Sequence, residues 1–357
     1  MRYHSLDALR AIAMFFGIAI HAVLPYTDPT VFQALSSADG PMPEAADIWH
    51  IMVIWIHQWR MPVFFILAGF FGALMLERRG RWGMLKDRGV RIFLALVVLL
   101  TLLTPLTDKQ WAELHHLWFL WFLVQFYAVQ LALSGAGRLF RPLLWIFEGP
   151  WRLALLLIPM VPLVLFAKHD LLFQIIPLTL WEVRPSGLVY YAFFFGTGIA
   201  LWHRRERLDD LARLWMPLVG YSLVVMIGLT VLGYSDEPPV WPNMIGIPTG
   251  QLALIFGLIG MAHALIRKGG PVLTFLVDSA YAVYIVHLYI VLIVAVFLID
   301  AGFSSWVVVP ASIGITVPLC LLTYVVLVRY TPFDWLLAGY KNARFKWPFS
   351  RMKRAST

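Results

Sequence analysis

The sequence contains a single cysteine, Cys320, and few charged residues. One cysteine cannot form an intramolecular disulfide, and it excludes a metal site built from several cysteines. Charged residues make up 13% of the 357 residues, whereas 61% are hydrophobic. Soluble domains carry about 25% charged residues on average. Together with a mean hydropathy of +0.77, this composition excludes an ordinary soluble protein and indicates one that lies in a membrane.

Runs of about 20 apolar residues recur along the chain, and an α-helix needs about this length to cross a hydrocarbon core of about 30 Å. We therefore expect an all-α, polytopic membrane protein with about ten transmembrane helices. The predicted spans are residues 6–26, 48–76, 90–107, 116–134, 152–167, 187–203, 213–233, 246–266, 274–299 and 306–329. The segment 168–186 is apolar but broken by Pro177, and we expect it to lie on the membrane surface or to re-enter the membrane.

No fixed-period repeat and no linker long enough for a soluble domain interrupts the series of spans. We expect one transmembrane domain over residues 1–335 and a basic tail over residues 336–357. The first apolar run has no small-residue cleavage site after it, so we interpret it as the first span rather than as a signal peptide.

Basic residues indicate the orientation of the chain, which carries a net charge of +8. Lys and Arg concentrate around residues 78–91, 138–141, 204–207 and 267–268 and in the tail, whereas the loops on the other side are mostly acidic. Because cytoplasmic loops are enriched in Lys and Arg, both termini are predicted to be cytoplasmic. The basic residues lie in short loops and in a tail suited to anionic lipid, which favours membrane topology over nucleic-acid binding.

Several titratable residues fall inside the predicted spans at similar depth. At about 1.5 Å per residue, His21 and His287 lie about 20 Å from the cytoplasmic surface. His57 and Arg60 lie in the outer half of the second span, and His116 begins the fourth. Polar residues in a span usually face the interior of the helix bundle and mark a functional site. The sequence therefore predicts a polar chamber on the outer side of the midplane.

Arg60 has no Asp or Glu at similar depth in any predicted span. An unpaired arginine at this depth is costly, so an anionic ligand is expected to complete its environment. No spacing of the H-E-x-x-H type is present, and we therefore expect no metal site.

Structural interpretations compete at other positions. A histidine in a membrane often only bonds a neighbouring helix, and this interpretation is favoured for His57, His115 and His263. Asp7 and Arg10 lie three residues apart, so an ion pair within one helix is as good an interpretation as ligand binding.

The segment "LDALRAIAMFFGIAIHA" resembles the first span of the acyltransferase 3 family, whose signature is Arg or Lys, ten residues, then His, here Arg10 and His21. Arg88 and Arg91 in "DRGVRIF" match the family's Arg-x-x-Arg pair. "FFILAGFF" at 64–71, "HLWFL" at 116–120 and "DSAYAVYIVH" at 278–287 resemble later signatures, although Ala68 replaces a serine found in many members. "WIHQWRMPVFFILAGFF" is similar to the glucans biosynthesis protein C subgroup, which is implicated in succinylating osmoregulated periplasmic glucans.

The resemblance implies a multi-pass O-acyltransferase of the bacterial inner membrane. It would move an acyl group, succinyl in that subgroup, from cytoplasmic acyl-CoA to hydroxyls of a periplasmic glucan, with acyl-CoA as a co-substrate and no further cofactor. Arg10, Arg88 and Arg91 are the expected acyl-CoA-binding residues, because guanidinium groups bind phosphates in a forked geometry.

The same resemblance gives expectations for the chemistry. His21 is the candidate general base, because neutral imidazole accepts a proton near pH 7; a covalent acyl-histidine is the alternative. His287 and Tyr284 would orient the base or polarise the thioester carbonyl. The acyl and acceptor groups would meet His57, Arg60 and His116, with Arg60 binding a succinyl carboxylate. Two other functions remain open: acylation of another polysaccharide or metabolite, and export of an acylated saccharide by a transporter or flippase. The sequence leaves the oligomeric state open.

Overall fold

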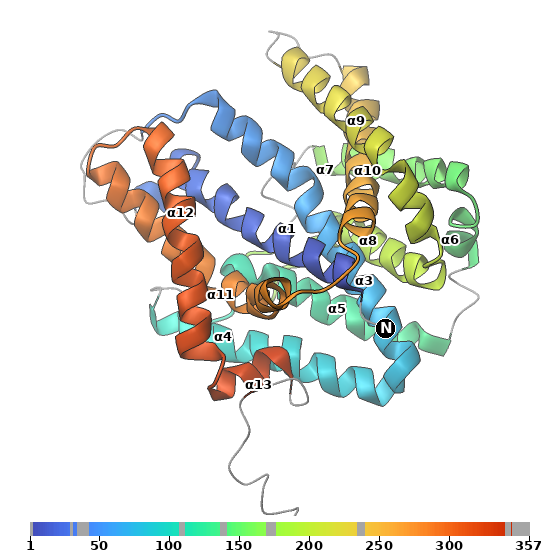
Figure 1. Ribbon diagram of the computed structural model, residues 1–357, viewed down its shortest axis with the longest axis horizontal. Helices are drawn as coiled ribbons and strands as arrows, with labels where there is room; N and C mark the ends of the chain where they lie inside the picture. Colours follow the sequence, from blue (N-terminus) through green and yellow to red (C-terminus); the bar gives the residue numbers. More distant parts are fainter. Residues whose placement is uncertain are drawn as a thin grey trace, which may run out of the picture.

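A computed structural model describes residues 3–28, 31–33, 43–106, 111–135, 141–168, 176–233, 240–339 and 344. Within these ranges every regular element is helical, apart from one isolated bridge between Glu113 and Thr179. Figure 1 shows the helices crossing one another at varied angles. The predicted all-α class is confirmed.

The α-helices are α1 (His4–Val23), α3 (Asp47–Arg88), α4 (Ala95–Leu103), α5 (Trp118–Ala132), α6 (Arg141–Ile146), α7 (Leu157–Lys168), α8 (Pro185–His203), α9 (Arg207–Gly233), α10 (Val240–Leu265), α11 (Pro271–Asp300), α12 (Ser305–Thr323) and α13 (Pro332–Ala338). Six helical stretches in the described part are long and apolar enough to cross a membrane. They are His4–Tyr26, Asp47–Leu103, Arg207–Leu232, Ile245–Leu265, Pro271–Asp300 and Ser305–Val328. This supports a multi-pass membrane protein, and the count of ten spans stays a prediction.

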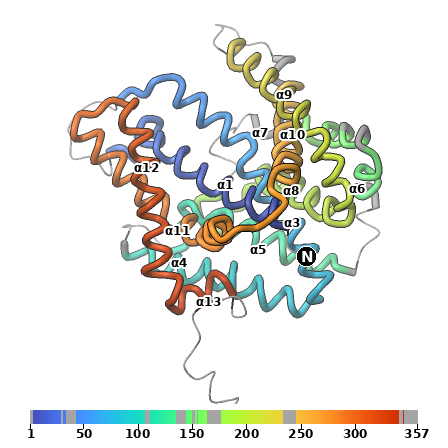
Figure 2. The backbone as a smooth tube through the Cα atoms, in the orientation of Figure 1, coloured from blue at the N-terminus to red at the C-terminus, as the bar shows by residue number. Residues whose placement is uncertain are grey.

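Helix α1 lies at the centre of the molecule, where it packs against α3, α10, α11 and α12 (Figure 2). Many of its buried residues are small or aliphatic, and Leu6, Ala8, Ala13 and Ile18 have no exposed surface. Small residues allow neighbouring helices to approach closely in a membrane protein. This central position carries His21 towards the interior and leaves Arg10 at its edge.

Helices α3 and α8 cross at two glycines. A Cβ atom at Gly69 would overlap the carbonyl oxygen of Phe195, and one at Gly198 would overlap the carbonyl oxygen of Ile66. Only glycine permits two backbones to come this close, so the two residues fix the crossing point.

The predicted loop between the second and third spans is largely helical. Helix α3 continues through it with a kink at Gly80, whose φ of 64° and ψ of −178° are accessible to glycine. The chain then passes through a π-helical stretch, η2 (Gly89–Leu94), into α4. The kink reverses the chain direction, as the turn from α3 into α4 in Figure 1 shows, and it places Asp87, Arg88 and Arg91 on a rigid helical segment.

The predicted span 152–167 is divided in the structure. The 3-10 helix η7 (Pro150–Leu156) precedes α7, which has only 12 residues and includes Pro162. Twelve residues reach about 18 Å, less than the hydrocarbon thickness.

The described part of segment 168–186 before α8 contains no helix. Leu114 N donates to Leu178 O at 2.7 Å, and Leu180 N donates to Ala112 O at 2.9 Å, so this part lies extended beside residues 112–114. Because residues 169–175 lie outside the described part, the expectation for the whole segment stays a prediction. At the other end of the chain, the predicted domain boundary at residue 335 falls inside α13. Beyond α13, the expected tail lies outside the described residues except for Gly339 and Arg344.

Candidate active site

Two groups of polar residues line the core around α1. The histidine chamber comprises His21, His57, Arg60, His116 and His287. The arginine cluster comprises Arg10, Arg79, Asp87, Arg88 and Arg91. They contain all the site residues that the sequence predicted except Tyr284, which lies between them on α11.

The histidine chamber brings together side chains from α1, α3, α11 and the 3-10 turn η4 (His115–Leu117). The ring centroids of His21 and His287 lie 5.2 Å apart, and those of His116 and His287 lie 5.9 Å apart. His287 is 1% exposed and His116 is 8% exposed. The predicted convergence of these histidines is therefore present, although they are far apart in the sequence.

Hydrogen bonds to backbone carbonyls fix the proton on two of these rings. His287 Nδ1 bonds the carbonyls of Val283 at 3.0 Å and Tyr284 at 2.8 Å. His116 Nε2 bonds the carbonyl of Ile285 at 3.1 Å. A carbonyl can only accept, so the bonded nitrogen carries the proton and the other nitrogen keeps its lone pair. His287 Nε2 and His116 Nδ1 are buried and have no hydrogen-bond partner in the described part of the chain.

Arg60 is buried beside these rings, with 7% of its surface exposed. Its Nε donates to Ala13 O at 2.9 Å, and its guanidinium group lies against Gly17. Among the described residues no carboxylate forms an ion pair with it. A buried cation without a counter-ion is costly, so the chamber is suited to hold an anionic group next to Arg60.

His57 and Tyr284 make local contacts at the edge of the chamber. His57 Nδ1 bonds Val53 O at 3.0 Å on its own helix, in keeping with a structural interpretation. The Tyr284 hydroxyl donates to His116 O at 2.6 Å. This hydrogen bond holds η4 in place, and the role expected for Tyr284 in orienting the base or polarising the thioester carbonyl stays a prediction.

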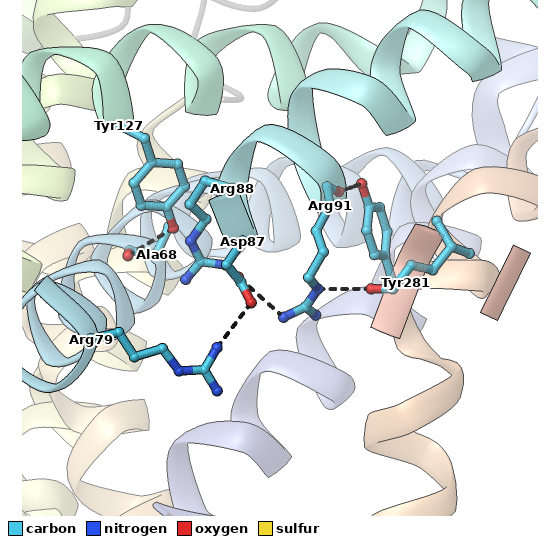
Figure 3. Close-up of polar contacts among 8 residues, drawn as sticks. Ala68, Arg79, Asp87, Arg88, Arg91, Tyr127 and Tyr281 are labelled. Atoms are coloured by element: carbon cyan, nitrogen blue, oxygen red, sulfur yellow. Dashed lines mark hydrogen bonds and ion pairs between the residues drawn. The ribbon is translucent and has the colours of Figure 1, made fainter. Parts of the chain in front are cut away.

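The arginine cluster is organised by one carboxylate (Figure 3). Asp87 accepts a hydrogen bond from Arg79 at 3.2 Å and forms ion pairs at 3.7 Å with both Arg88 and Arg91. Three guanidinium groups thus share one negative charge. The cluster therefore carries a net positive charge, and Arg10 lies close enough to Arg91 to add to it. This charge makes this end of the bundle suited to a polyanion such as a phosphate chain.

Aromatic and backbone groups hold the two signature arginines. The guanidinium carbon of Arg88 lies 4.7 Å from the ring centre of Tyr127, whose hydroxyl donates to Ala68 O at 3.0 Å. Arg91 Nε donates to Leu337 O of α13 at 2.9 Å. These contacts hold the side chains of Arg88 and Arg91 in position.

Arg10 forms the expected ion pair with Asp7, at 3.2 Å, so that structural alternative is correct. Its guanidinium carbon also lies 5.7 Å from the ring centre of Phe71. The side chain is 37% exposed, so Arg10 remains accessible to a ligand at the edge of the cluster.

One face of α11 connects the two groups. The Tyr281 hydroxyl donates to Arg91 O at 2.6 Å, at the arginine cluster. The ring centroids of Tyr281 and Tyr284 lie 6.3 Å apart, and those of Tyr284 and His287 are also 6.3 Å apart. A continuous aromatic path therefore leads from Arg91 to His287.

Sequence reasoning missed several of these residues. Arg79 was interpreted only as a topology-setting charge, yet it bonds Asp87. Asp87 lies directly before the matched Arg-x-x-Arg pair but was given no role, and Tyr127 lies in none of the matched motifs. His263, by contrast, contacts Ser5 and Asp209 away from both groups, in keeping with the structural interpretation favoured for it. In the part of the chain that the structure describes, no three His, Cys, Asp or Glu side chains are placed to hold a metal ion.

Comparison with known proteins gives one result. The acyltransferase 3 family model, described as an acyltransferase domain, matches residues 3–325 and therefore covers both groups of polar residues. No curated protein and no solved structure gives a significant match.

Proposed function

The chain belongs to the acyltransferase 3 family, and we propose that this membrane acyltransferase moves an acyl group from cytoplasmic acyl-CoA to a hydroxyl of a glycan on the far side of the membrane. The observation that carries this proposal is the path along α11 between an arginine cluster and a histidine chamber. Acyl transfer from CoA across a membrane needs an anion-binding end and a proton-accepting end joined by a passage.

The arginine cluster would bind the phosphates of CoA. Arg88 and Arg91 would donate in forks to phosphate oxygens, with Arg10 at the edge of the site. Asp87 and Tyr127 would hold these arginines in place. The acyl-pantetheine arm would then follow Tyr281 and Tyr284 towards His287, which places the thioester in the chamber.

Transfer takes place when the acceptor hydroxyl attacks the thioester carbonyl and loses its proton. A neutral histidine of the chamber accepts that proton, and the sequence favours His21 for this role. The carbonyl oxygen becomes negative during the attack, and Arg60 stabilises it or a carboxylate on the acyl group. His57 and His116 would line the space that the acyl group and the acceptor occupy.

We propose succinyl-CoA as the donor and a periplasmic glucan as the acceptor, in the inner membrane of a bacterium. The unpaired cation of Arg60 supports an acyl group that carries its own carboxylate. The similarity of "WIHQWRMPVFFILAGFF" and "HHLWFLWFLV" to the periplasmic glucan subgroup supports the acceptor. The short predicted outer loops favour a shallow vestibule for this glucan rather than a deep cleft.

The test uses purified protein in detergent with radiolabelled succinyl-CoA or acetyl-CoA and added glucan. We expect label to move to the glucan, and His21→Ala to abolish this transfer while CoA binding persists. His263→Gln is the matched control, because His263 lies outside both groups. Failure of the wild-type protein to consume either donor would contradict the proposal. Export of a saccharide from vesicles without consumption of acyl-CoA would instead support a transporter.

A further inference from the structure

We infer that His287, through its Nε2 atom, is the general base of the reaction, and that His21 donates a hydrogen bond to the reacting carbonyl oxygen. This assignment rests on the acyl transfer proposed above and exchanges the roles that the sequence suggests. The assignment follows from the ring nitrogens of His287 and His21, because one nitrogen of His287 is hydrogen-bonded and neither nitrogen of His21 is bonded to another described residue.

His287 has the features of an oriented base. Its Nδ1 proton bonds two carbonyls of its own helix, at 2.8 and 3.0 Å, which leaves the lone pair on Nε2. In hydrolases with a catalytic histidine, a hydrogen bond to one ring nitrogen likewise fixes the tautomer and aims the other nitrogen at the reacting proton. The Nε2 of His287 is buried and has no partner among the described residues.

His21 lacks such an orienting contact. No hydrogen bond joins either of its nitrogens to another described residue, and its Nδ1 is buried without a partner. The ring is half-buried and remains more accessible than His287. A neutral imidazole that is free in this way can turn and donate its one N–H to an oxygen, whichever nitrogen carries the proton.

The position of the His287 lone pair supports this division. Nε2 lies 3.1 Å from the point that a Cβ of Gly17 would occupy, and the guanidinium group of Arg60 lies against the same glycine. The proton acceptor and a cation therefore lie close together beside Gly17. Such a pair is suited to the negative charge that develops when a hydroxyl loses its proton and attacks a carbonyl.

His116 is the other ring with a fixed lone pair, on Nδ1. Its closest ring contacts are Tyr284 at 5.4 Å and Tyr289 at 5.6 Å, and it lies on η4, the turn that the Tyr284 hydroxyl holds. Gly17 and the guanidinium group of Arg60 adjoin the nitrogen of His287. We therefore assign the proton transfer to His287.

The step balances as follows. The acceptor hydroxyl gives its proton to His287 Nε2 while its oxygen forms a bond to the thioester carbonyl carbon. The carbon–sulfur bond breaks, and the electron pair leaves with the CoA sulfur. His287 then returns the proton to that sulfur, which releases CoA as a free thiol. His21 donates its hydrogen bond to the carbonyl oxygen throughout.

Glutamine substitutions separate the two roles, because a glutamine side chain donates an N–H but cannot accept a proton at neutral pH. We expect His287→Gln to lower kcat at least about 100-fold, the lower range for a general base. His21→Gln should retain kcat within about 10-fold, and KM for acyl-CoA should change little in either. An equal loss in the two variants, or a larger loss in His21→Gln or His116→Gln, would overturn the assignment. His263→Gln controls for the loss of an imidazole elsewhere.

A second measurement needs no catalytic activity. In ¹⁵N-histidine-labelled wild-type protein in detergent, the nitrogen chemical shifts report which ring nitrogen carries the proton, and His287→Gln serves only to assign the signal. We expect the Nδ1–H tautomer at His287, and the Nε2–H tautomer there would overturn the inference. Absence of acyl transfer by the wild-type protein would instead refute the proposed function and leave this tautomer result standing.

Discussion

The backbone of Gly17 lies directly against the guanidinium group of Arg60. A Cβ atom at residue 17 would overlap Nη2 of Arg60, and it would lie 2.8 Å from the guanidinium carbon. Gly17, a residue of α1 without a side chain, thus leaves the room that the guanidinium group of Arg60 occupies. Among the described residues of the histidine chamber, Arg60 is the buried cation that has no carboxylate partner. The spacing between Arg10 and His21 is the recognisable feature of this helix, but Gly17 shapes the space between them.

Gly17→Ala is therefore expected to displace the Arg60 side chain without unfolding the protein, because the overlapping atoms belong to the end of a flexible side chain. We expect kcat for acyl transfer to fall at least about 10-fold, which corresponds to about 1.4 kcal/mol of transition-state stabilisation. The measurement is steady-state transfer of label from acyl-CoA, with thermal unfolding in detergent recorded in parallel.

The control for this variant is Gly220→Ala. Nothing lies within 4 Å of a Cβ atom at Gly220, which is in α9. We expect full activity and a stability equal to or higher than wild type, since alanine is favoured over glycine in a helix by about 1 kcal/mol. A comparable loss of activity in this control would show that the effect at Gly17 is not local.

Loss of a guanidinium from the arginine cluster should weaken donor binding. We expect Arg88→Ala and Arg91→Ala each to raise KM for acyl-CoA at least about 10-fold, because a hydrogen bond between charged groups contributes about 1.5–3 kcal/mol. The same variants should bind free CoA more weakly, as measured by calorimetry. Arg78→Ala removes a charge from the same helical segment but outside the cluster, and it should leave KM within about 2-fold. An unchanged KM in Arg88→Ala and Arg91→Ala would remove the cluster from the donor site.

The role of Arg60 in donor choice can be tested separately. If its guanidinium binds a carboxylate of the acyl group, Arg60→Ala should lower kcat/KM for succinyl-CoA more than for acetyl-CoA, by at least about 10-fold in the ratio. Competition between the two labelled donors in one reaction gives this ratio directly. An equal loss for both donors would assign Arg60 to the carbonyl oxygen alone and exclude it from acyl selection.

The crossing of α3 and α8 predicts a variant that changes stability. Gly198→Ala places a methyl group onto the carbonyl oxygen of Ile66, and a backbone atom cannot move aside as a side chain can. We expect the protein to lose about 1–3 kcal/mol of stability, as overpacked sites do, and to unfold at a lower temperature in detergent. A midpoint equal to that of wild type would show that the two helices can separate at this point.

Several features followed from the sequence alone because they depend on composition or on local spacing. Apolar runs of membrane-spanning length predict helices in lipid whatever their neighbours are, since an unbonded backbone is too costly there. The spacing from Arg10 to His21 sets their separation along one rigid helix, at about 1.5 Å per residue. Similar depth was enough to predict that the histidines of different spans would meet.

Only the tertiary structure decided which atoms face one another. Asp87 contacts Arg79, Arg88 and Arg91 because the kink at Gly80 and the π-helical stretch η2 bring these side chains together. No sequence motif indicates this change in the direction of the chain. The free nitrogen of His287 depends on carbonyls of its own helix and on the closeness of Gly17. Helix position can be predicted from a periodic pattern, whereas the groups that a lone pair faces are decided by contacts between segments that are distant in the chain.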